Sequence, residues 1–246
     1  MTDWERYLGL AFLGPLLWAE GKYVRRVTPQ LPEPPGAREG TIGQGPLLRL
    51  LIAGDSAAAG VGAASQDEAL CGRLVGRLRP HFTLEWRLLA INGLDSPGLV
   101  KLLEETPADR FDVVVLSIGV NDVTSLRSPS QWLKWQDKLA SVIRSRFEPQ
   151  LLIHSAIPPM QGFTAMPQPL RWFMGRWALE MNQRLEATLS AKTERLLHWP
   201  FREAASDGLA ADGFHPGPVG YDLWAEGLSR VILSSTSLGS QCASCR

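Results

Sequence analysis

The chain has 246 residues, of which 45% are apolar and 20% are charged. This length allows one or two domains, and the apolar content is enough for a buried core, so a disordered or fibrous chain is excluded. Lys and Arg number 25, and Asp and Glu also number 25, so the net charge is zero. Because no basic excess exists to neutralise a phosphate backbone, the sequence predicts no nucleic-acid partner.

The N-terminal segment contains an uncharged apolar run over residues 7–19. A bilayer crossing needs about 20 apolar residues, and the run lacks the charge order and cleavage site of a secretory signal. Two interpretations remain. The run forms a helix packed on the domain, or it makes peripheral membrane contact over residues 7–26, with Lys22, Arg25 and Arg26 at the lipid headgroups. We expect a cytoplasmic protein, associated with a membrane in the second case.

The stretch 28–46 contains five prolines and four glycines. Proline fixes φ and removes a backbone donor, so this composition predicts a linker or surface arm. We therefore divide the chain into an N-terminal apolar helix and Pro/Gly-rich arm at 1–46, a globular domain at 47–235 and a C-terminal tail at 236–246. The tail holds Cys242 and Cys245, a single C-x-x-C that predicts neither a disulfide framework nor a zinc site.

Within the globular domain, apolar runs alternate with segments of helical periodicity. The runs predict strands at 48–53, 84–91, 112–118, 151–157 and 195–199. Apolar residues at spacings of three and four predict helices at 68–79, 96–105, 129–147, 177–189 and 219–233. In the second of these helices we expect Ser96 to be the N-cap. The alternation predicts an α/β fold in which helices cover both faces of a mostly parallel sheet.

Small polar clusters stand at four of the predicted junctions between elements. They are Gly54-Asp55-Ser56, Asn92-Gly93, Gly119-Val120-Asn121-Asp122 and Asp212-Gly213-Phe214-His215. The first three follow the first three strands, and the fourth precedes the last helix. Because ligands of parallel α/β sheets bind at the carboxyl ends of the strands, we expect the four clusters to meet at one edge of the sheet.

These residue types meet the requirements of ester hydrolysis. Ser56 is the candidate nucleophile, and a serine hydroxyl needs a base to take its proton. His215 is the candidate base, while Asp212 can fix the tautomer of its ring and stabilise the imidazolium. The candidate donors to an oxyanion are the backbone amides of Ser56 and Gly93 and the side-chain amide of Asn121.

Residues 47–235 resemble the SGNH, or GDSL-type, hydrolases. The matching blocks are Gly54-Asp55-Ser56, Gly93, Gly119-x-Asn121-Asp122 and Asp212-x-x-His215. The resemblance implies a flavodoxin-like α/β/α sandwich with a parallel sheet of about five strands, no metal, and hydrolysis through an acyl-enzyme on Ser56. Members include carboxylesterases, lysophospholipases, thioesterases and carbohydrate acetylesterases. Ala57 replaces the leucine of the GDSL motif, a change that affects packing more than chemistry.

Two other architectures fit less well. A Gly-x-Ser-x-Gly esterase is disfavoured because Ala58 stands where the second glycine belongs. A dinucleotide-binding module would use the glycines of residues 60–65, with Glu85 as its acidic residue. Six residues separate that stretch from the strand, however, so we expect no cofactor.

The loop 158–169 follows the fourth predicted strand and should lie at the same edge as the polar clusters. Its apolar side chains include Met160 and Phe163, which we expect to line an acyl pocket; a loop that packs into the core is an equal alternative. The sequence thus predicts a small-molecule ester substrate with a short or medium acyl chain, and it leaves the oligomeric state open. Lysophospholipase, thioesterase and carbohydrate acetylesterase activities are the alternatives within the same family.

Overall fold

The computed structural model describes residues 3–189, 193–198 and 208–235. Within these ranges the strands are β1 (Glu39–Ile42), β2 (Leu47–Gly54), β3 (Thr83–Ala90), β4 (Val113–Ser117), β5 (Leu151–Ser155) and β6 (Glu194–Leu197). The α-helices are α1 (Asp3–Val27), α2 (Ser56–Ala59), α3 (Leu70–Leu78), α4 (Ser96–Glu105), α5 (Val120–Thr124), α6 (Pro129–Phe147), α7 (Leu170–Glu186) and α8 (Pro218–Ser234), and η1 (Met160–Gly162) is a 3-10 turn.

The strands form one sheet in the order β1-β3-β2-β4-β5-β6. The strands from β2 to β6 run parallel to their neighbours, and β1 pairs antiparallel with β3 at one edge. All five predicted strands are present, so the mostly parallel sheet is confirmed. Because β2 lies between β3 and β4, the residues that follow β2 emerge between the loops that follow those two strands.

Edge strand β1 lies within the Pro/Gly-rich arm, where the sequence predicted no strand. Gly40 is opposite Trp86 of β3, and the Trp86 ring occupies the space that a side chain at residue 40 would need. Gly43, with φ of 97°, then passes against the backbone of Phe82. The glycines therefore let a short segment lie close against the sheet, although their low strand propensity hides the strand in the sequence.

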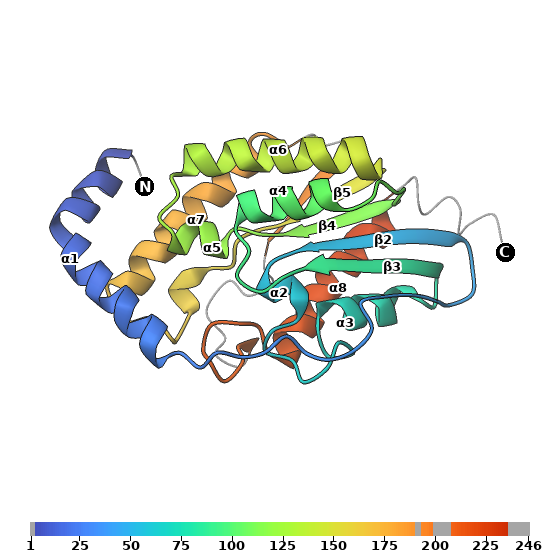
Figure 1. Cartoon of the computed structure of the whole chain (residues 1–246), viewed down its shortest axis with the longest axis horizontal. Helices are drawn as coiled ribbons and strands as arrows, with labels where there is room; N and C mark the ends of the chain where they lie inside the picture. Colours follow the sequence, from blue (N-terminus) through green and yellow to red (C-terminus); the bar gives the residue numbers. More distant parts are fainter. Residues whose placement is uncertain (1–2, 190–192, 199–207, 236–246) are drawn as a thin grey trace.

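Helices cover both faces of the sheet, which confirms the three-layer architecture (Figure 1). On one face, alternate residues of β2 such as Leu50 and Ile52 pack with apolar residues of α3 and α8, including Leu74 and Trp224. On the other face, Leu51 and its neighbours pack with α4 and α6. Every residue of β4 and β5 is buried, as expected for parallel strands covered on both sides.

The residue that caps the N-terminus of α4 is one position earlier than the sequence predicted. Asp95, not Ser96, is the N-cap, and its carboxylate accepts from Gly98 N at 3.0 Å. The prediction of Ser96 as the cap was wrong because the Ser96 hydroxyl donates instead to Asp122, at 2.7 Å. Asp95 is an equally favourable capping residue, so the helix keeps its expected bounds.

Helix α1 packs on the domain through one narrow face. Leu17 and Val24 are buried in a cluster with residues of α7, and Glu20 accepts from the backbone N–H of Leu170 at 2.9 Å. The opposite side exposes large apolar side chains, among them Phe12 at 80% and Trp18 at 65%. Over the described ranges, no helix combines the length and apolar character that a bilayer crossing requires.

Candidate active site

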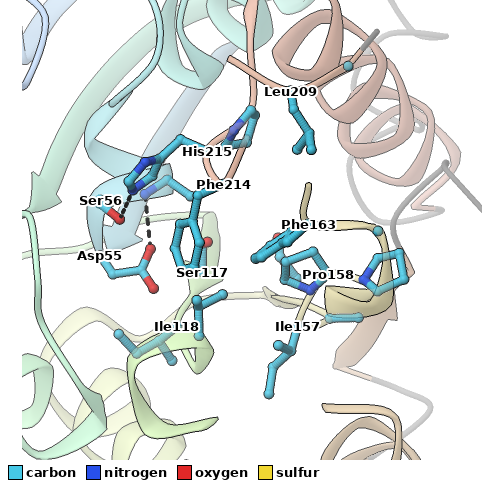
Figure 2. A pocket seen from close by; sticks show the side chains of 18 residues that line it. Asp55, Ser56, Ser117, Ile118, Ile157, Pro158, Phe163, Leu209, Phe214 and His215 are labelled. Carbon is cyan, nitrogen blue, oxygen red and sulfur yellow. Dashed lines mark hydrogen bonds between the residues drawn. The ribbon is translucent and has the colours of Figure 1, made fainter. Parts of the chain in front are cut away.

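Three of the four predicted polar clusters contribute residues to a pocket at the carboxyl ends of the strands, between the segments after β2, β4 and β5 and the segment before α8 (Figure 2). Asn92 and Gly93, of the fourth cluster, are not among its lining residues. Its cavity volume is about 60 Å³. Ser56 and His215 stand at one side, and the other walls are largely apolar. The apolar lining includes Ile118, Val120, Ile157, Pro158, Pro159, Phe163, Leu209, Phe214 and Pro216.

The turn after β2 presents Ser56 at the first position of α2. Gly54 ends the strand, and the carbonyl oxygen of Ser117 on β4 fills the space where a side chain at residue 54 would lie. Asp55 then caps α2 by accepting from Ala57 N at 3.1 Å, and Gly60 ends the helix in the left-handed conformation. Gly54 and the Asp55 cap thus allow a short connection from β2 into α2, and Gly60 allows the chain to leave the helix after one turn.

Ser56, His215 and Asp212 form a continuous hydrogen-bonded series. Ser56 Oγ lies 2.9 Å from His215 Nε2, and His215 Nδ1 lies 2.6 Å from Asp212 Oδ2. The second carboxylate oxygen of Asp212 accepts from the backbone N–H groups of Phe214 and His215, at 3.0 Å each. These residues are 156 to 159 positions apart from Ser56 in the chain, and the fold brings them together as the sequence predicted.

The environment of Asp212 keeps its carboxylate ionised. Burial acts to raise the pKa of Asp212, but the hydrogen bonds from the His215 ring and from the two backbone N–H groups outweigh it and lower the pKa below its ordinary value. Asp55, which lies beside Ser56, has the opposite balance. Its burial raises the pKa to about 7, against the opposing effects of the Ala57 N–H and of His215.

The segment that carries His215 is held against the loop that follows α2. Ala210 N donates to the His215 carbonyl at 2.8 Å, and Tyr221 Oη donates to the carbonyl of Val61 at 2.7 Å. Gly62, with φ of 103°, lies directly beneath the Pro216 carbonyl, and a side chain at residue 62 would collide with it. The glycine pair at residues 60 and 62 therefore has a structural explanation, and Glu85 pairs with Arg49 at 3.0 Å instead of facing those glycines.

The three predicted oxyanion donors come from three different segments, namely α2 after β2, the turn after β3 and α5 after β4. Among the described residues, the backbone N–H groups of Ser56 and Gly93 have no hydrogen-bond partner. The Asn121 side-chain N–H₂ donates to the carbonyl of Leu94 at 2.7 Å, which leaves its second hydrogen available. Gly93 has φ of 84° and is exposed, so the turn that carries its N–H depends on glycine.

The structure separates the two residues proposed for the acyl pocket. Phe163 lines the pocket, whereas Met160 is fully buried in the cluster beneath it and is not part of the wall. Phe214, which sequence reasoning did not single out, packs on Phe163 with ring centroids 4.8 Å apart and on the His215 ring at 5.2 Å. The sequence could have indicated Phe214 as a pocket residue, because it directly precedes His215.

The remaining candidate ligands do not gather. Among the described residues, no group of three or more His, Cys, Asp or Glu side chains is arranged to hold a metal ion. Cys71 is buried on α3, and its burial raises the thiol pKa to about 12. Cys242 and Cys245 lie outside the described residues.

Known proteins resemble this chain in sequence and in fold. Residues 52–223 match the model of the GDSL-like lipase/acylhydrolase family. The GDSL-like esterase Rv1075c of Mycobacterium tuberculosis (strain H37Rv) is 29% identical over 246 aligned residues, which cover 89% of this chain and 76% of that protein.

Two solved structures share the fold. A lipase, Lip_vut3, from a goat rumen metagenome is 18% identical with a TM-score of 0.60, covering 74% of this chain and 96% of its own. A G-D-S-L lipolytic protein from Veillonella parvula is 16% identical with a TM-score of 0.62, covering 76% of this chain and 99% of its own. Since the family model spans more than half of the sequence, the chain belongs to the GDSL-like lipase/acylhydrolase family and is a carboxylic ester hydrolase.

Proposed function

We propose that the chain hydrolyses esters of short acyl groups through an acyl-enzyme on Ser56, with His215 as the base and Asp212 as the group that orients it. The observation that carries this proposal is the 2.9 Å separation between Ser56 Oγ and His215 Nε2. This distance allows direct transfer of the hydroxyl proton to the imidazole. The ionised Asp212 accepts from the ring Nδ1–H and stabilises the positive charge that develops on the imidazole.

The reaction runs in two halves. Ser56 Oγ attacks the carbonyl carbon of the ester while its proton moves to His215 Nε2, and the tetrahedral oxyanion accepts hydrogen bonds from the Ser56 and Gly93 amides and from Asn121. The intermediate collapses, the alcohol leaves with the proton from His215, and the acyl group stays on Ser56. Water then attacks the acyl-enzyme with His215 again as the base, which releases the carboxylic acid and restores the serine.

Loss of the nucleophile tests this assignment. Ser56→Ala should abolish p-nitrophenyl acetate hydrolysis and labelling by a fluorophosphonate, because both require attack by this hydroxyl. A Ser117→Ala protein loses a different pocket serine and should still take the label. Retained turnover in purified Ser56→Ala protein contradicts the proposal.

Asn121→Ala should remain folded and turn over roughly 10²–10³-fold more slowly, the usual effect of losing one oxyanion donor.

The size of the pocket supports a short acyl chain. Its volume of about 60 Å³ is well below the roughly 300–1,000 Å³ of clefts that bury drug-sized ligands. Phe163 and Phe214 pack on each other at its wall, so they limit the length of chain that can enter. Turnover of p-nitrophenyl esters should therefore be fastest for acetate or butyrate, and Phe163→Ala should shift the preference toward longer chains. An unchanged chain-length profile contradicts this role of Phe163.

A small acyl pocket also suits acetylated carbohydrates, because the acetyl group is the only part that must enter it. Two further structures with this fold are an acetylxylan esterase from Geobacillus stearothermophilus and a family two carbohydrate esterase from Clostridium thermocellum, solved with cellohexaose. Comparing kcat/KM for acetylated xylo-oligosaccharides and for p-nitrophenyl acetate tests this second substrate class. A higher value for the oligosaccharides favours a carbohydrate acetylesterase.

The exposed side of α1 supports peripheral membrane contact. Phe12, Leu16 and Tyr23 are exposed at spacings that place them on one helical face. Lys22, Arg25 and Arg26 are exposed nearby, whereas Glu20 faces the protein. This combination of apolar and cationic side chains is complementary to an anionic lipid surface.

Sedimentation with vesicles tests the membrane contact. The full chain should bind phosphatidylcholine vesicles that contain phosphatidylglycerol and should release as salt rises. A Phe12→Ser/Trp18→Ser variant should lose binding. A Leu47→Ser/Leu233→Ser variant, which changes exposed apolar residues elsewhere, should retain it. Self-association of the chain without vesicle binding assigns this face to a second copy and contradicts the proposal.

A further inference from the structure

The turn that carries Gly93 and the segment that carries Asn121, which includes α5, follow strands that do not touch each other; they are called the first and second loop below. Gly93 follows β3 and Asn121 follows β4, while β2, which ends at Gly54 and leads to Ser56, lies between those strands. No pairing within the sheet therefore holds the two loops in register. The proposed oxyanion donors need that register, because a misplacement of about 1 Å can cost roughly 10²-fold in rate.

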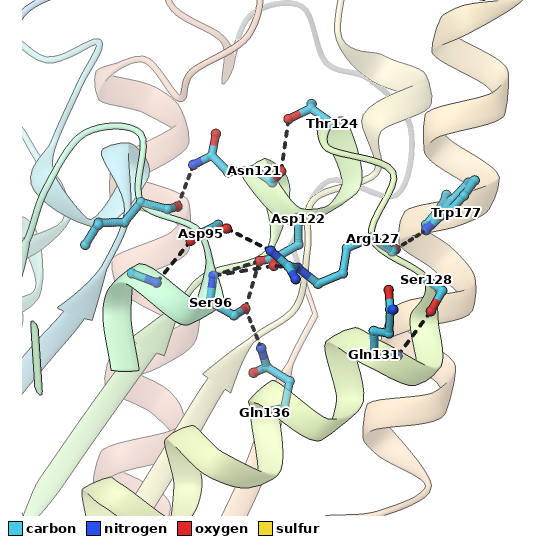
Figure 3. Close-up of polar contacts among 12 residues, drawn as sticks. Asp95, Ser96, Asn121, Asp122, Thr124, Arg127, Ser128, Gln131, Gln136 and Trp177 are labelled. Carbon is cyan, nitrogen blue, oxygen red and sulfur yellow. Dashed lines mark hydrogen bonds and ion pairs between the residues drawn. The ribbon is translucent and has the colours of Figure 1, made fainter. Parts of the chain in front are cut away.

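Two neighbouring residues of the second loop bind the first loop directly. Asn121 donates to the carbonyl of Leu94, the residue after Gly93, at 2.7 Å. Asp122 accepts from Ser96 twice, from its hydroxyl at 2.7 Å and from its backbone N–H at 3.1 Å (Figure 3). These contacts tie Asn121 to the residue before the cap of α4 and Asp122 to the first turn of that helix.

Arg127 completes the connection from a third position. Its Nε donates to Asp122 Oδ1 at 2.6 Å, and its Nη2 donates to Asp95 Oδ2 at 2.8 Å. One guanidinium therefore bridges a carboxylate of each loop, in the forked geometry that lysine cannot reproduce. The Arg127 carbonyl accepts from Trp177 Nε1 at 3.0 Å, which anchors this segment on α7.

The buried position of Asp122 makes the contacts with Arg127 and Ser96 necessary. The Asp122 side chain has no exposed surface, and burial raises its pKa although Ser96 and Arg127 oppose the shift. Gln136 of α6 also donates to the Ser96 hydroxyl, at 3.1 Å, so that the network is supported from beneath. A buried carboxylate that lost Arg127 would be left with an uncompensated charge, and the two segments would lose the bridge between Asp122 and Asp95.

We propose that Arg127 is a positioning residue that, through Asp122, Asp95 and Ser96, holds Gly93 and Asn121 at the distance required to bind the oxyanion together. This inference rests on the proposed function, since it assigns a task to donors of that reaction. Arg127 itself lines no part of the pocket and touches no reacting atom.

A double-mutant cycle with Asn121 tests the proposal in the full chain. Arg127→Gln should lower kcat and kcat/KM for p-nitrophenyl acetate by roughly 10- to 100-fold, with KM changed less than about threefold, because the lost interaction acts in the transition state. Arg127→Lys should recover part of kcat. In an Asn121→Ala background, Arg127→Gln should cost less than about threefold, because the pair of donors whose spacing it sets is already broken.

Two controls separate positioning from general damage to the fold. Arg144 pairs with buried Glu194 at 2.7 Å on the far part of the sheet, so Arg144→Gln removes a comparable ion pair and should leave kcat within about twofold. Ser96→Ala removes one hydroxyl of the network without changing charge, and it serves where Arg127→Gln folds poorly. It should show a smaller loss of kcat with the same non-additivity toward Asn121→Ala.

The outcomes distinguish this proposal from the proposed function. The positioning role is overturned if Arg127→Gln lowers kcat by the same factor in the wild-type and Asn121→Ala backgrounds, and Ser96→Ala does so too. That result leaves Ser56 as the nucleophile. A rise in KM without a fall in kcat also overturns it. Turnover that survives Ser56→Ala instead removes the reaction on which the inference rests.

Discussion

Asp55 and Asp212 are two carboxylates of one site whose surroundings act in opposite directions. Asp212 receives hydrogen bonds from the His215 ring and two backbone N–H groups, which lower its pKa. Asp55 is buried and receives one from Ala57 N, which does not outweigh desolvation, so its pKa rises to about 7. The carboxylate that must stay charged beside the imidazole is thus well supplied with donors, while its neighbour at the helix cap is not.

The shift at Asp55 predicts a pH dependence of stability. Its pKa is 3.8 ordinarily and about 7 in the folded chain, a shift of about 3 units or, at roughly 1.4 kcal/mol per unit, about 4 kcal/mol. Because the folded-state pKa of Asp55 is raised, ionisation of its buried carboxyl opposes folding. The free energy of unfolding is therefore unaffected by this group below pH 3.8, and it falls as the pH rises from there to about 7. Asp55→Asn keeps an acceptor for Ala57 N but does not titrate.

Urea unfolding at pH 5 and pH 8 measures this effect. The difference in unfolding free energy between the two pH values should be displaced in Asp55→Asn relative to wild type, in favour of the variant at pH 8. A constant penalty from the new amide N–H₂ is the same at both pH values and cancels. Parallel pH dependences for the two proteins contradict the assignment of the buried carboxyl.

At the residue scale, the sequence predicted which side chains meet better than it predicted what holds them. Ser56, Asp212 and His215 were predictable because each belongs to a short motif whose residue types and spacing are typical of a nucleophile or of an acid–base pair. Arg127 was not, because its position follows no motif and its partners Asp95 and Asp122 lie on two loops that only the tertiary fold brings together.

At the element scale, the site depends on the close approach of the loop after α2 to the segment before α8. Gly62 makes this approach possible, since Pro216 O, the Ala210 side chain at 2.9 Å and the His215 Cβ at 3.4 Å surround the place of a missing Cβ. Any side chain at residue 62 must push that segment away. The movement would carry the His215 ring from Ser56.

Gly62→Ala should therefore lower both stability and turnover. The positive φ and the collision cost about 1–3 kcal/mol, and displacement of the base should reduce kcat by roughly tenfold or more per folded molecule. Gly76→Ala is the matched control, because Gly76 lies within α3 with nothing near its Cβ position, and it should stabilise the chain by about 0.5–1 kcal/mol. Thermal unfolding and kcat on p-nitrophenyl acetate check both; full activity in folded Gly62→Ala contradicts this role.

Elements were predictable where burial is continuous and less so where glycine or proline dominates. The five parallel strands were found because runs such as Val113–Ser117 are buried on both faces. Strand β1 was missed, since its four residues include Gly40 and its partner contact is a ring from another strand. The cap of α4 was misplaced by one residue because Asp95 and Ser96 are both good caps, and only the tertiary contact with Asp122 decides between them.

At the scale of the whole molecule, α1 is set apart from the three layers. It lies at one end of the molecule and packs on α7, through the cluster that contains Leu17 and Val24 (Figure 1). That cluster also includes Phe163 of the pocket wall. Helix α1 is therefore connected to the pocket through buried apolar contacts, and it contributes no lining residue itself. An element held by one narrow contact should open more readily than the sheet.

Leu17→Ala should therefore release α1 selectively. Loss of a buried leucine costs about 2–5 kcal/mol, so the open population, and with it trypsin cleavage after Lys22, Arg25 and Arg26, should rise by roughly 30-fold or more. Leu16 is the adjacent control, because its side chain is 48% exposed and Leu16→Ala removes little packing. Cleavage that is equally fast in both variants means that the buried face of α1 does not hold the helix, whereas a difference at these three sites alone identifies Leu17 as the contact that keeps it docked.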